Sequence, residues 1–289
     1  MKAAPPAFLR GAREMSPAAS LVLLLPFLGV LLLAFLAPIG VLMHESLFVP
    51  APTLRHYARV FDDPVYLRVL WRTLRIAGLV TVITLVLAYP LAVVMARSHG
   101  WVLAVLAACV MLPLWTSVLV RTYAWTVLMR RNGLINQALL ALGIVDQPVR
   151  LLYTEGAVVL AMAHVLLPFM ALPIWTTLLA IPPDYGRAAA VMGAPPWRSF
   201  VEVTLPLSRP GVGSGCLMVF LLALGFFVTP ALVGGPQQMM IATLISQQVR
   251  ALLNWPFAGA LVGCLLLLTL ALVAIFNRAM RLDRFVAGQ

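Results

Sequence analysis

Long apolar runs alternate with shorter polar segments along this chain. The runs lie at residues 21–43, 76–96, 101–129, 156–181, 212–233 and 256–277. A helical membrane crossing takes about 20 predominantly apolar residues, so each run is long enough to span a bilayer. Only helices and closed barrels satisfy their backbone groups in lipid, and unbroken apolar runs favour helices. The pattern therefore predicts an all-α, polytopic membrane protein with about six transmembrane helices.

The polar segments differ in length and predict how the spans are connected. Residues 97–100 are so few that the second and third spans are expected to form a tight helical hairpin. Residues 44–75 predict a loop with a short interfacial helix, whereas 130–155 and 234–255 predict longer loops. Lipid-buried helices tolerate proline because neighbouring helices satisfy the freed backbone groups. The prolines within the spans are Pro38, Pro90, Pro113, Pro168, Pro173 and Pro230.

The composition argues against a separate soluble domain. The 289 residues are 63% hydrophobic and 10% charged, whereas soluble domains carry about 25% charged residues. We therefore expect one transmembrane domain over residues 1–289. The net charge of +11 comes from arginines near the ends of the apolar runs, where they contact lipid phosphates rather than nucleic acid. Basic clusters at both chain ends favour a cytoplasmic N-terminal segment, residues 1–20, and a cytoplasmic C-terminus.

The chain lacks the sequence patterns of an ATP site or a catalytic centre. Lys2 is the only lysine, and no glycine-rich loop precedes it, so a Walker-type phosphate loop is absent. No G-x-S-x-G nucleophile motif occurs. The histidines and cysteines form no metal-like cluster in sequence: His44, His56, His99, His164, Cys109, Cys216 and Cys264. We therefore expect no catalytic residue, metal or cofactor here, and any ATP to be bound by a partner chain. The spans also contain no Asp or Glu, which argues against an ion-coupled carrier.

Two ionisable residues lie within the apolar runs. Arg121 is followed closely by Tyr123 and Trp125, and His164 lies in the fourth run. One interpretation places all four side chains on a substrate path. In the alternative, Arg121 reaches the lipid headgroups beside an aromatic belt, and His164 faces a neighbouring helix. The sequence leaves both interpretations open.

A long polar segment, PPDYGRAAAVMGAPPWRSFVEVTLPLSRPG, separates the fourth and fifth spans at residues 182–211. It predicts two short surface helices separated by a Pro-Pro pair. Asp184 is expected to cap the first helix and Gly193 to end it. The second helix is expected to run to Thr204, where Leu205 and Pro206 break it. Small side chains on the first helix allow another backbone to approach, so the segment is either a docking surface or an ordinary amphipathic connector.

Within this segment, the chain resembles the EAA loop of ABC importer permeases of the six-span, type I class. The resemblance rests on Ala188, Ala189, Gly193, Val203, Leu205 and Pro206, which lie at the offsets of that loop. It implies a coupling helix that docks in a groove of a cytoplasmic ATPase, and we call residues 182–211 the coupling loop. Arg187 stands where that family has an acidic residue, which leaves the charge contact of this position open.

Three longer segments, residues 112–136, 151–175 and 225–261, are similar to the spermidine/putrescine permeases. The resemblance implies a permease subunit of an ABC importer for polyamines or a related small solute, in a bacterial inner membrane. It also implies two ATPase subunits, a second homologous permease in a heterodimer, and a periplasmic or extracellular solute-binding protein. The alternative is a stand-alone channel or secondary carrier.

Overall fold

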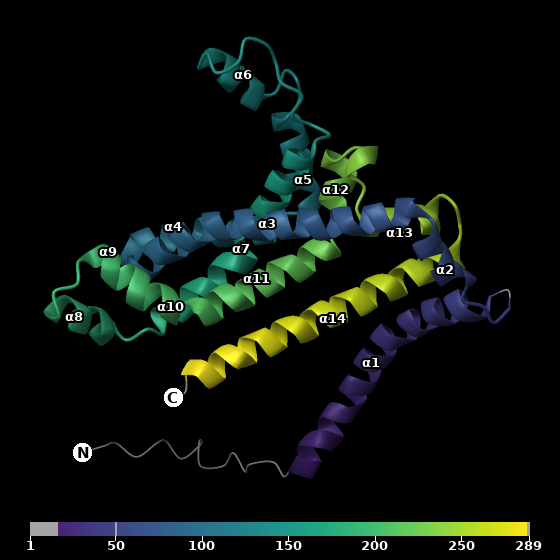
Figure 1. The fold of residues 1–289 in the computed structure, drawn as a ribbon, viewed down its shortest axis with the longest axis horizontal. Coiled ribbons are helices and arrows are strands. Elements are labelled where there is room, and N and C mark those ends of the chain that lie inside the picture. The colour runs from purple at the N-terminus through teal and green to yellow at the C-terminus, as the bar shows by residue number, and fades with distance from the viewer. Residues whose placement is uncertain (1–16, 50, 288–289) are drawn as a thin grey trace.

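Helices make up the regular structure of the described part of the chain (Figure 1). The computed structural model describes residues 17–49 and 51–287, so most of the predicted N-terminal segment lies outside it. Within this part, four helices are long and apolar enough to cross a membrane on their own. They are α1 (Pro17–Phe48), α3 (Pro64–Arg97), α7 (Glu155–Leu179) and α14 (Trp255–Ala287). The prediction of an all-α, multi-span membrane protein is confirmed.

The third and fifth predicted spans are broken helices. The pairs are α4 (Gly100–Trp115) with α5 (Val118–Leu128), and α11 (Arg209–Leu224) with α12 (Val228–Val233). The axes of α4 and α5 differ by 102°. Pro113 lies near the end of α4 and Gly225 caps α11, and both residue types weaken helix continuation. The predicted spans at 101–129 and 212–233 are therefore each interrupted within the apolar run.

Helix α7 forms the centre of the bundle and packs against α3, α4 and α11. Its largest fully buried side chains are Met162, Leu166, Met170 and Ile174. Helix α11 approaches α7 closely because position 211 is glycine. A Cβ at Gly211 would lie 2.5 Å from Thr177 Oγ1 and 2.7 Å from the carbonyl oxygen of Pro173. Small residues permit such close crossings of membrane helices, so α7 and α11 form a tightly packed pair.

A second group of helices pairs α1 with α14 and includes α2 (Arg55–Asp62) and α13 (Ile241–Arg250). Tyr66 of α3 packs edge-on against Phe257 of α14, with ring centroids 4.9 Å apart. The backbone N–H of Ile241 donates to Thr73 Oγ1 at 2.9 Å. These contacts attach the second group to α3. None of the most apolar window of α1 is buried within the chain, which suits a helix that faces lipid.

Two segments predicted as loops contain helices, namely α6 (Leu134–Ala141) and α13. Helix α13 buries Ile241, Leu244 and Gln248, a spacing that places one face of a helix against the bundle. Helix α6 projects away from the bundle beyond α5 (Figure 1). Both are short and lie outside the apolar runs, so no span-length pattern marks them. The short helix predicted within residues 44–75 is confirmed as α2.

Candidate functional site

The coupling loop joins α7 to α11 at the end of the bundle where α3 also ends (Figure 1). It contains α8 (Pro183–Val191), α9 (Pro196–Ser199), the π-helical turn η2 (Phe200–Thr204) and α10 (Leu205–Leu207). Helix α8 and the continuous segment from α9 to α10 are the two predicted surface helices. The Pro-Pro pair separates them, so this part of the prediction is confirmed.

Helix α8 begins at Pro183, and Asp184 is not its cap. Pro182 occupies the N-cap position, and no side chain caps the helix. Proline at the first helical position is favourable because a helix leaves that N–H unpaired in any case. Asp184 lies in the first turn, where its Oδ1 accepts a hydrogen bond from Arg187 Nη1 at 3.1 Å. The predicted capping role of Asp184 is therefore wrong, and Arg187 has an acidic neighbour within its own helix.

Two exposed ion pairs lie on the coupling loop. One joins Arg187 to Asp184, and the other joins Arg198 Nε to Glu202 Oε1 at 2.8 Å. The hydrogen bond to Glu202, together with its charge, raises the pKa of Arg198. Water screens both pairs because all four side chains are more than half exposed. The pairs therefore orient surface side chains and contribute little to folding.

The end of α8 has the hydrogen bonds of a Schellman motif. Gly193 has a φ angle of 80°, a left-handed conformation that favours glycine. The N–H of Gly193 donates to the carbonyl of Ala190, and the N–H of Ala194 to that of Ala189, both at 3.0 Å. The prediction that Gly193 ends the first helix is confirmed. A Cβ at this position would meet no atom within 4 Å, so the surface beside it is open.

The exposed face of α8 is more apolar than its small residues alone indicate. Ala188 is exposed, but Ala189 is only 5% exposed and so adds little to the outer surface. The tip of the helix carries Val191 and Met192, which are 89% and 81% exposed. We call these two side chains the apolar tip. Neither residue belongs to the site predicted from the sequence. Two apolar residues directly before a glycine in a polar segment could have indicated them.

The second helix continues through Pro206, beyond its predicted end at Thr204. A proline has no N–H for the carbonyl four residues earlier, and here the helix widens into a π turn. The N–H of Leu205 accordingly donates to the carbonyl of Phe200, five residues back. Val203 and Pro206 are half-buried, whereas Leu205 is 40% exposed. The expected helix break at Leu205 and Pro206 is wrong, because the π turn lets the helix continue past the proline.

Tyr89 of α3 connects the coupling loop to the bundle. Its hydroxyl lies 2.9 Å from Ser208 Oγ, and its ring packs edge-on against Phe200 with centroids 6.1 Å apart. Ser208 is fully buried and also donates to the carbonyl of Leu205 at 2.9 Å. It lies where the loop turns by 59° into α11. These contacts fix that turn against α3.

Of the four residues predicted for a substrate path, Trp125 and His164 are in direct contact. Trp125 Nε1 donates to His164 Nδ1 at 3.2 Å, and the rings meet edge-on with centroids 5.7 Å apart. Arg121 lies one helical turn before Trp125, and its Nε and Nη1 are buried without a hydrogen-bond partner. The burial of these two atoms argues against their direct contact with lipid headgroups. Tyr123 is 60% exposed and makes no side-chain hydrogen bond with the other three.

The helical segments that follow the two breaks pack together. Thr122 Oγ1 of α5 lies 3.0 Å from Thr229 Oγ1 of α12, and both side chains are fully buried. Both segments also contact α7, which carries His164. Broken helices free backbone polar groups, and a membrane tolerates these only against protein or a water-filled cavity. Such breaks commonly line the solute path of transporters.

The remaining histidine and cysteine side chains of the described residues are scattered. Within the described residues, no group of three or more His, Cys, Asp or Glu is placed to hold a metal ion. Cys109, Cys216 and Cys264 are free thiols on separate helices. His44 stacks on Phe48 within α1.

Comparison with known proteins agrees with this geometry. A family model described as "Binding-protein-dependent transport system inner membrane component" matches residues 88–282. This chain belongs to that family. The permease is 35% identical over 260 residues to the spermidine/putrescine transport system permease protein PotB of Haemophilus influenzae, covering 90% of the chain and 89% of that relative. It is 32% identical over 203 residues to the molybdenum transport system permease protein ModB of Mycobacterium bovis, covering 70% and 75% of the two chains.

The fold of the permease also resembles a solved structure, that of a bacterial alginate ABC transporter in complex with an alginate pentasaccharide-bound periplasmic protein. The TM-score is 0.75 at 18% identity, with 90% of this chain and 93% of the other covered. Family membership makes the permease a multi-pass inner-membrane subunit of an ABC importer. It is a transporter subunit rather than an enzyme, and it works with a separate ATPase and a solute-binding protein.

Proposed function

We propose that the permease imports a polyamine such as spermidine or putrescine, or a related small solute, by alternating access driven by separate ATPase subunits. Its similarity to PotB over 90% of the chain supports the polyamine, and its similarity to ModB is the reason for the wider solute class. The complete importer in proteoliposomes is expected to accumulate labelled spermidine when ATP is supplied on the ATPase side. Vigorous ATP hydrolysis without spermidine accumulation would contradict the polyamine assignment.

The coupling loop is the proposed docking site for the ATPase, and the exposed tip of α8 is the observation that carries this proposal. An open surface lies beside the apolar tip. It is formed by the exposed Arg187 and Ala188 together with Gly193. The half-buried Val203 and Pro206 support the loop from the bundle side, and Leu205 lies beside them. Ala189 has a supporting role because it is buried. An exposed apolar tip beside an open surface suits insertion into a groove of a partner.

A charge placed at Gly193 tests the docking site. Gly193→Asp is expected to leave membrane insertion intact and to abolish co-purification of the ATPase, since it adds a carboxylate to the open surface. Gly193→Ala is the matched control, because it shares the left-handed φ strain of about 1–2 kcal/mol without the charge. Normal co-purification of the ATPase with Gly193→Asp would refute the assignment of this surface.

The proposed assembly contains two ATPase subunits that bind the ATP, a second homologous permease in a heterodimer, and a periplasmic or extracellular solute-binding protein. The proposal also puts both chain termini in the cytoplasm, on the same side as the coupling loop. The chain reconstituted alone is then expected to carry no solute flux. Flux without an ATPase would refute the subunit role in favour of a stand-alone channel or secondary carrier.

The proposed solute path runs past Arg121, Trp125 and His164, along the side of α5 that faces α7. The unpartnered guanidinium atoms of Arg121 are the supporting observation. Tyr123 stays a weaker candidate because it is exposed and separate from the other three. Arg121→Ala is expected to abolish uptake while the ATPase still assembles. Unchanged uptake would favour the headgroup interpretation of Arg121.

A further inference from the structure

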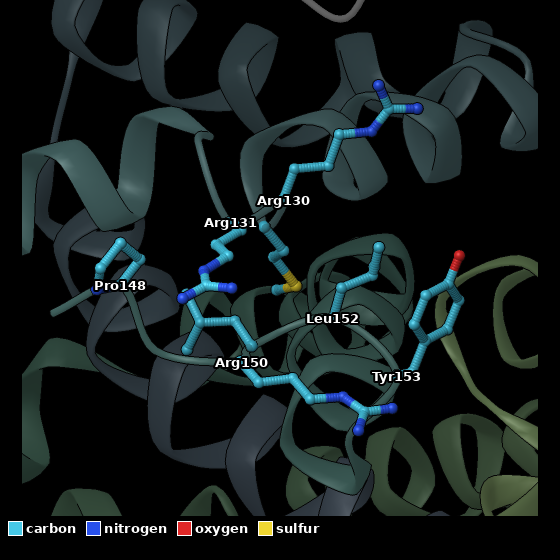
Figure 2. A pocket seen from close by; sticks show the side chains of 8 residues that line it. Arg130, Arg131, Pro148, Arg150, Leu152 and Tyr153 are labelled. Atoms are coloured by element: carbon cyan, nitrogen blue, oxygen red, sulfur yellow. The ribbon is translucent and has the colours of Figure 1, made fainter.

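A basic pocket of about 420 Å³ lies between the end of α5 and the start of α7. The start of α7 is the opposite end of that helix from the coupling loop. The pocket is lined by Met129, Arg130, Arg131, Pro148, Arg150, Leu151, Leu152 and Tyr153. Figure 2 shows Arg130 and Arg131 on one side of Leu152, and Arg150 with Tyr153 on the other, with Arg130 reaching away from the other two guanidinium groups.

No carboxylate among the described residues compensates these three arginines. None of them forms an ion pair within the described chain, and the nearby Glu155 is bound to Arg75 at 3.3 Å. The three guanidinium groups are exposed and directed to no protein acceptor. A guanidinium presents a planar fork of donors that matches a phosphate group. The pocket therefore has the positive charge to attract a phosphate-bearing anion, and each guanidinium offers donors that such an anion accepts.

Buried hydrogen bonds hold the walls of the basic pocket in place. Asn136 is fully buried, and its Nδ2 donates to the carbonyls of Arg130 and Val149 at 3.2 and 3.0 Å. Its Oδ1 accepts from the N–H of Val149 at 2.9 Å. One side chain thus ties the segment of Arg130 and Arg131 to the segment of Arg150. The arginines are presented by a built scaffold rather than by a free loop.

The position of Tyr153 is also fixed. It has a φ angle of 63°, which costs a side-chain-bearing residue about 1–2 kcal/mol. Its N–H donates to the carbonyl of Val233 at 3.0 Å, which ties this wall to α12. A second hollow of about 410 Å³, which shares Arg150 and Tyr153, continues toward residues 234–238. The two hollows together provide room for a group larger than a bare phosphate.

The floor of the basic pocket is apolar and continuous with the membrane-spanning helices. Met129, Leu151 and Leu152 pack with Ala157 and Ala161 of α7 in one hydrophobic cluster. Cationic side chains over an apolar floor, at the end of a membrane helix, match a phospholipid, whose phosphate and first methylene groups need adjacent polar and apolar contacts. A water-soluble anion would gain nothing from this floor.

We propose that the basic pocket binds the phosphate group of an anion, which in the membrane is the headgroup of an acidic phospholipid. The bound headgroup would hold the end of α5 to the start of α7, the two helices that carry Trp125 and His164. The proposal does not depend on which solute the permease carries.

Lipid retention by the purified, complete importer tests the proposal. The complex is equilibrated with phosphatidylglycerol in a phosphatidylcholine background, and the retained lipids are counted by native mass spectrometry. The test variant carries Arg130→Gln, Arg131→Gln and Arg150→Gln. The control carries Arg68→Gln, Arg72→Gln and Arg250→Gln, which remove the same charge outside the pocket. The test variant is expected to lose phosphatidylglycerol affinity by roughly a hundredfold, and the control to behave as wild type.

Further arms separate the sources of the phosphate. The Arg→Lys triple variant should retain more phosphatidylglycerol than the Gln triple, since it keeps the charge. If the lipid is not enriched but inorganic phosphate raises the Tm of the wild type and not of the Gln triple, the phosphate site stands and the lipid source is refuted. Equal lipid retention by wild type and the Gln triple, without a phosphate effect, overturns the proposal. Loss of solute-binding-protein affinity alone in the Gln triple overturns it in favour of protein carboxylates.

Discussion

Replacing the apolar tip of the coupling loop by serine, Val191→Ser with Met192→Ser, is expected to weaken ATPase binding strongly. The side chains are 89% and 81% exposed in the permease, so nearly all of their surface is available to a partner. Full burial of a Val or Met side chain contributes about 1.5–3 kcal/mol. If the ATPase covers both, the double variant loses about 2.5–5 kcal/mol, which is roughly 60- to 4000-fold in affinity. The fold should be unaffected, because neither side chain packs inside the permease.

The assay titrates the purified ATPase onto the assembled permease pair in nanodiscs, with thermal stability recorded for each variant. The control is Leu252→Ser with Leu253→Ser, since these side chains are 60% and 71% exposed in the loop between α13 and α14. The control should bind the ATPase as the wild type does. An affinity of the Val191 and Met192 variant within about threefold of wild type would show that the tip is not the anchor, and the area argument would fail.

Three further changes probe the contacts around the loop. Tyr89→Phe removes the hydroxyl that bonds Ser208 and is expected to cost about 1 kcal/mol, seen as a lower Tm; an unchanged Tm would contradict the role of Tyr89. Gly211→Val places methyl groups against α7 and is expected to destabilise the permease by about 1–3 kcal/mol, measured by thermal unfolding, whereas an unchanged Tm would mean that the crossing can widen freely. Asp184→Asn breaks the exposed pair with Arg187 and should change ATPase affinity by less than about threefold; a larger loss in the same titration would make this pair part of the docking contact.

The number and type of spans could be predicted because they depend on local properties of the chain. A run of about 20 apolar residues is long enough to cross a membrane as a helix wherever its neighbours lie. The 102° bend between α4 and α5 could not be predicted. Pro113 weakens the helix there, but the angle also reflects where α5 packs, and α5 is bonded to α12 through Thr122 and Thr229, 107 positions apart. A single sequence carries no direct signal for such a pairing.

In the candidate site, too, local features could be predicted and long-range contacts could not. Gly193 was predictable because a helix end is decided by the conformation of one residue and its immediate neighbours. Asp184 was mispredicted because two local partners compete for its carboxylate, and Arg187 binds it instead of a backbone N–H. The link from Tyr89 to Ser208 spans 119 positions and was invisible in the sequence. The burial of Ala189 beside the exposed Ala188 likewise depends on tertiary packing.

The contacts provide a mechanical route from the coupling loop to the proposed solute path. Tyr89 fixes the turn at Ser208 to α3, and the close crossing at Gly211 fixes α11 to α7. Two-thirds of the apolar window of α7 is buried, so this helix cannot bend independently of its neighbours. The two helix breaks are the places where the chain can change direction without disrupting that core. A displacement of the loop by an ATPase would therefore move α3, α7 and α11 together and be absorbed at the breaks. Helix α5, which carries both Arg121 and Trp125, begins at one of these breaks.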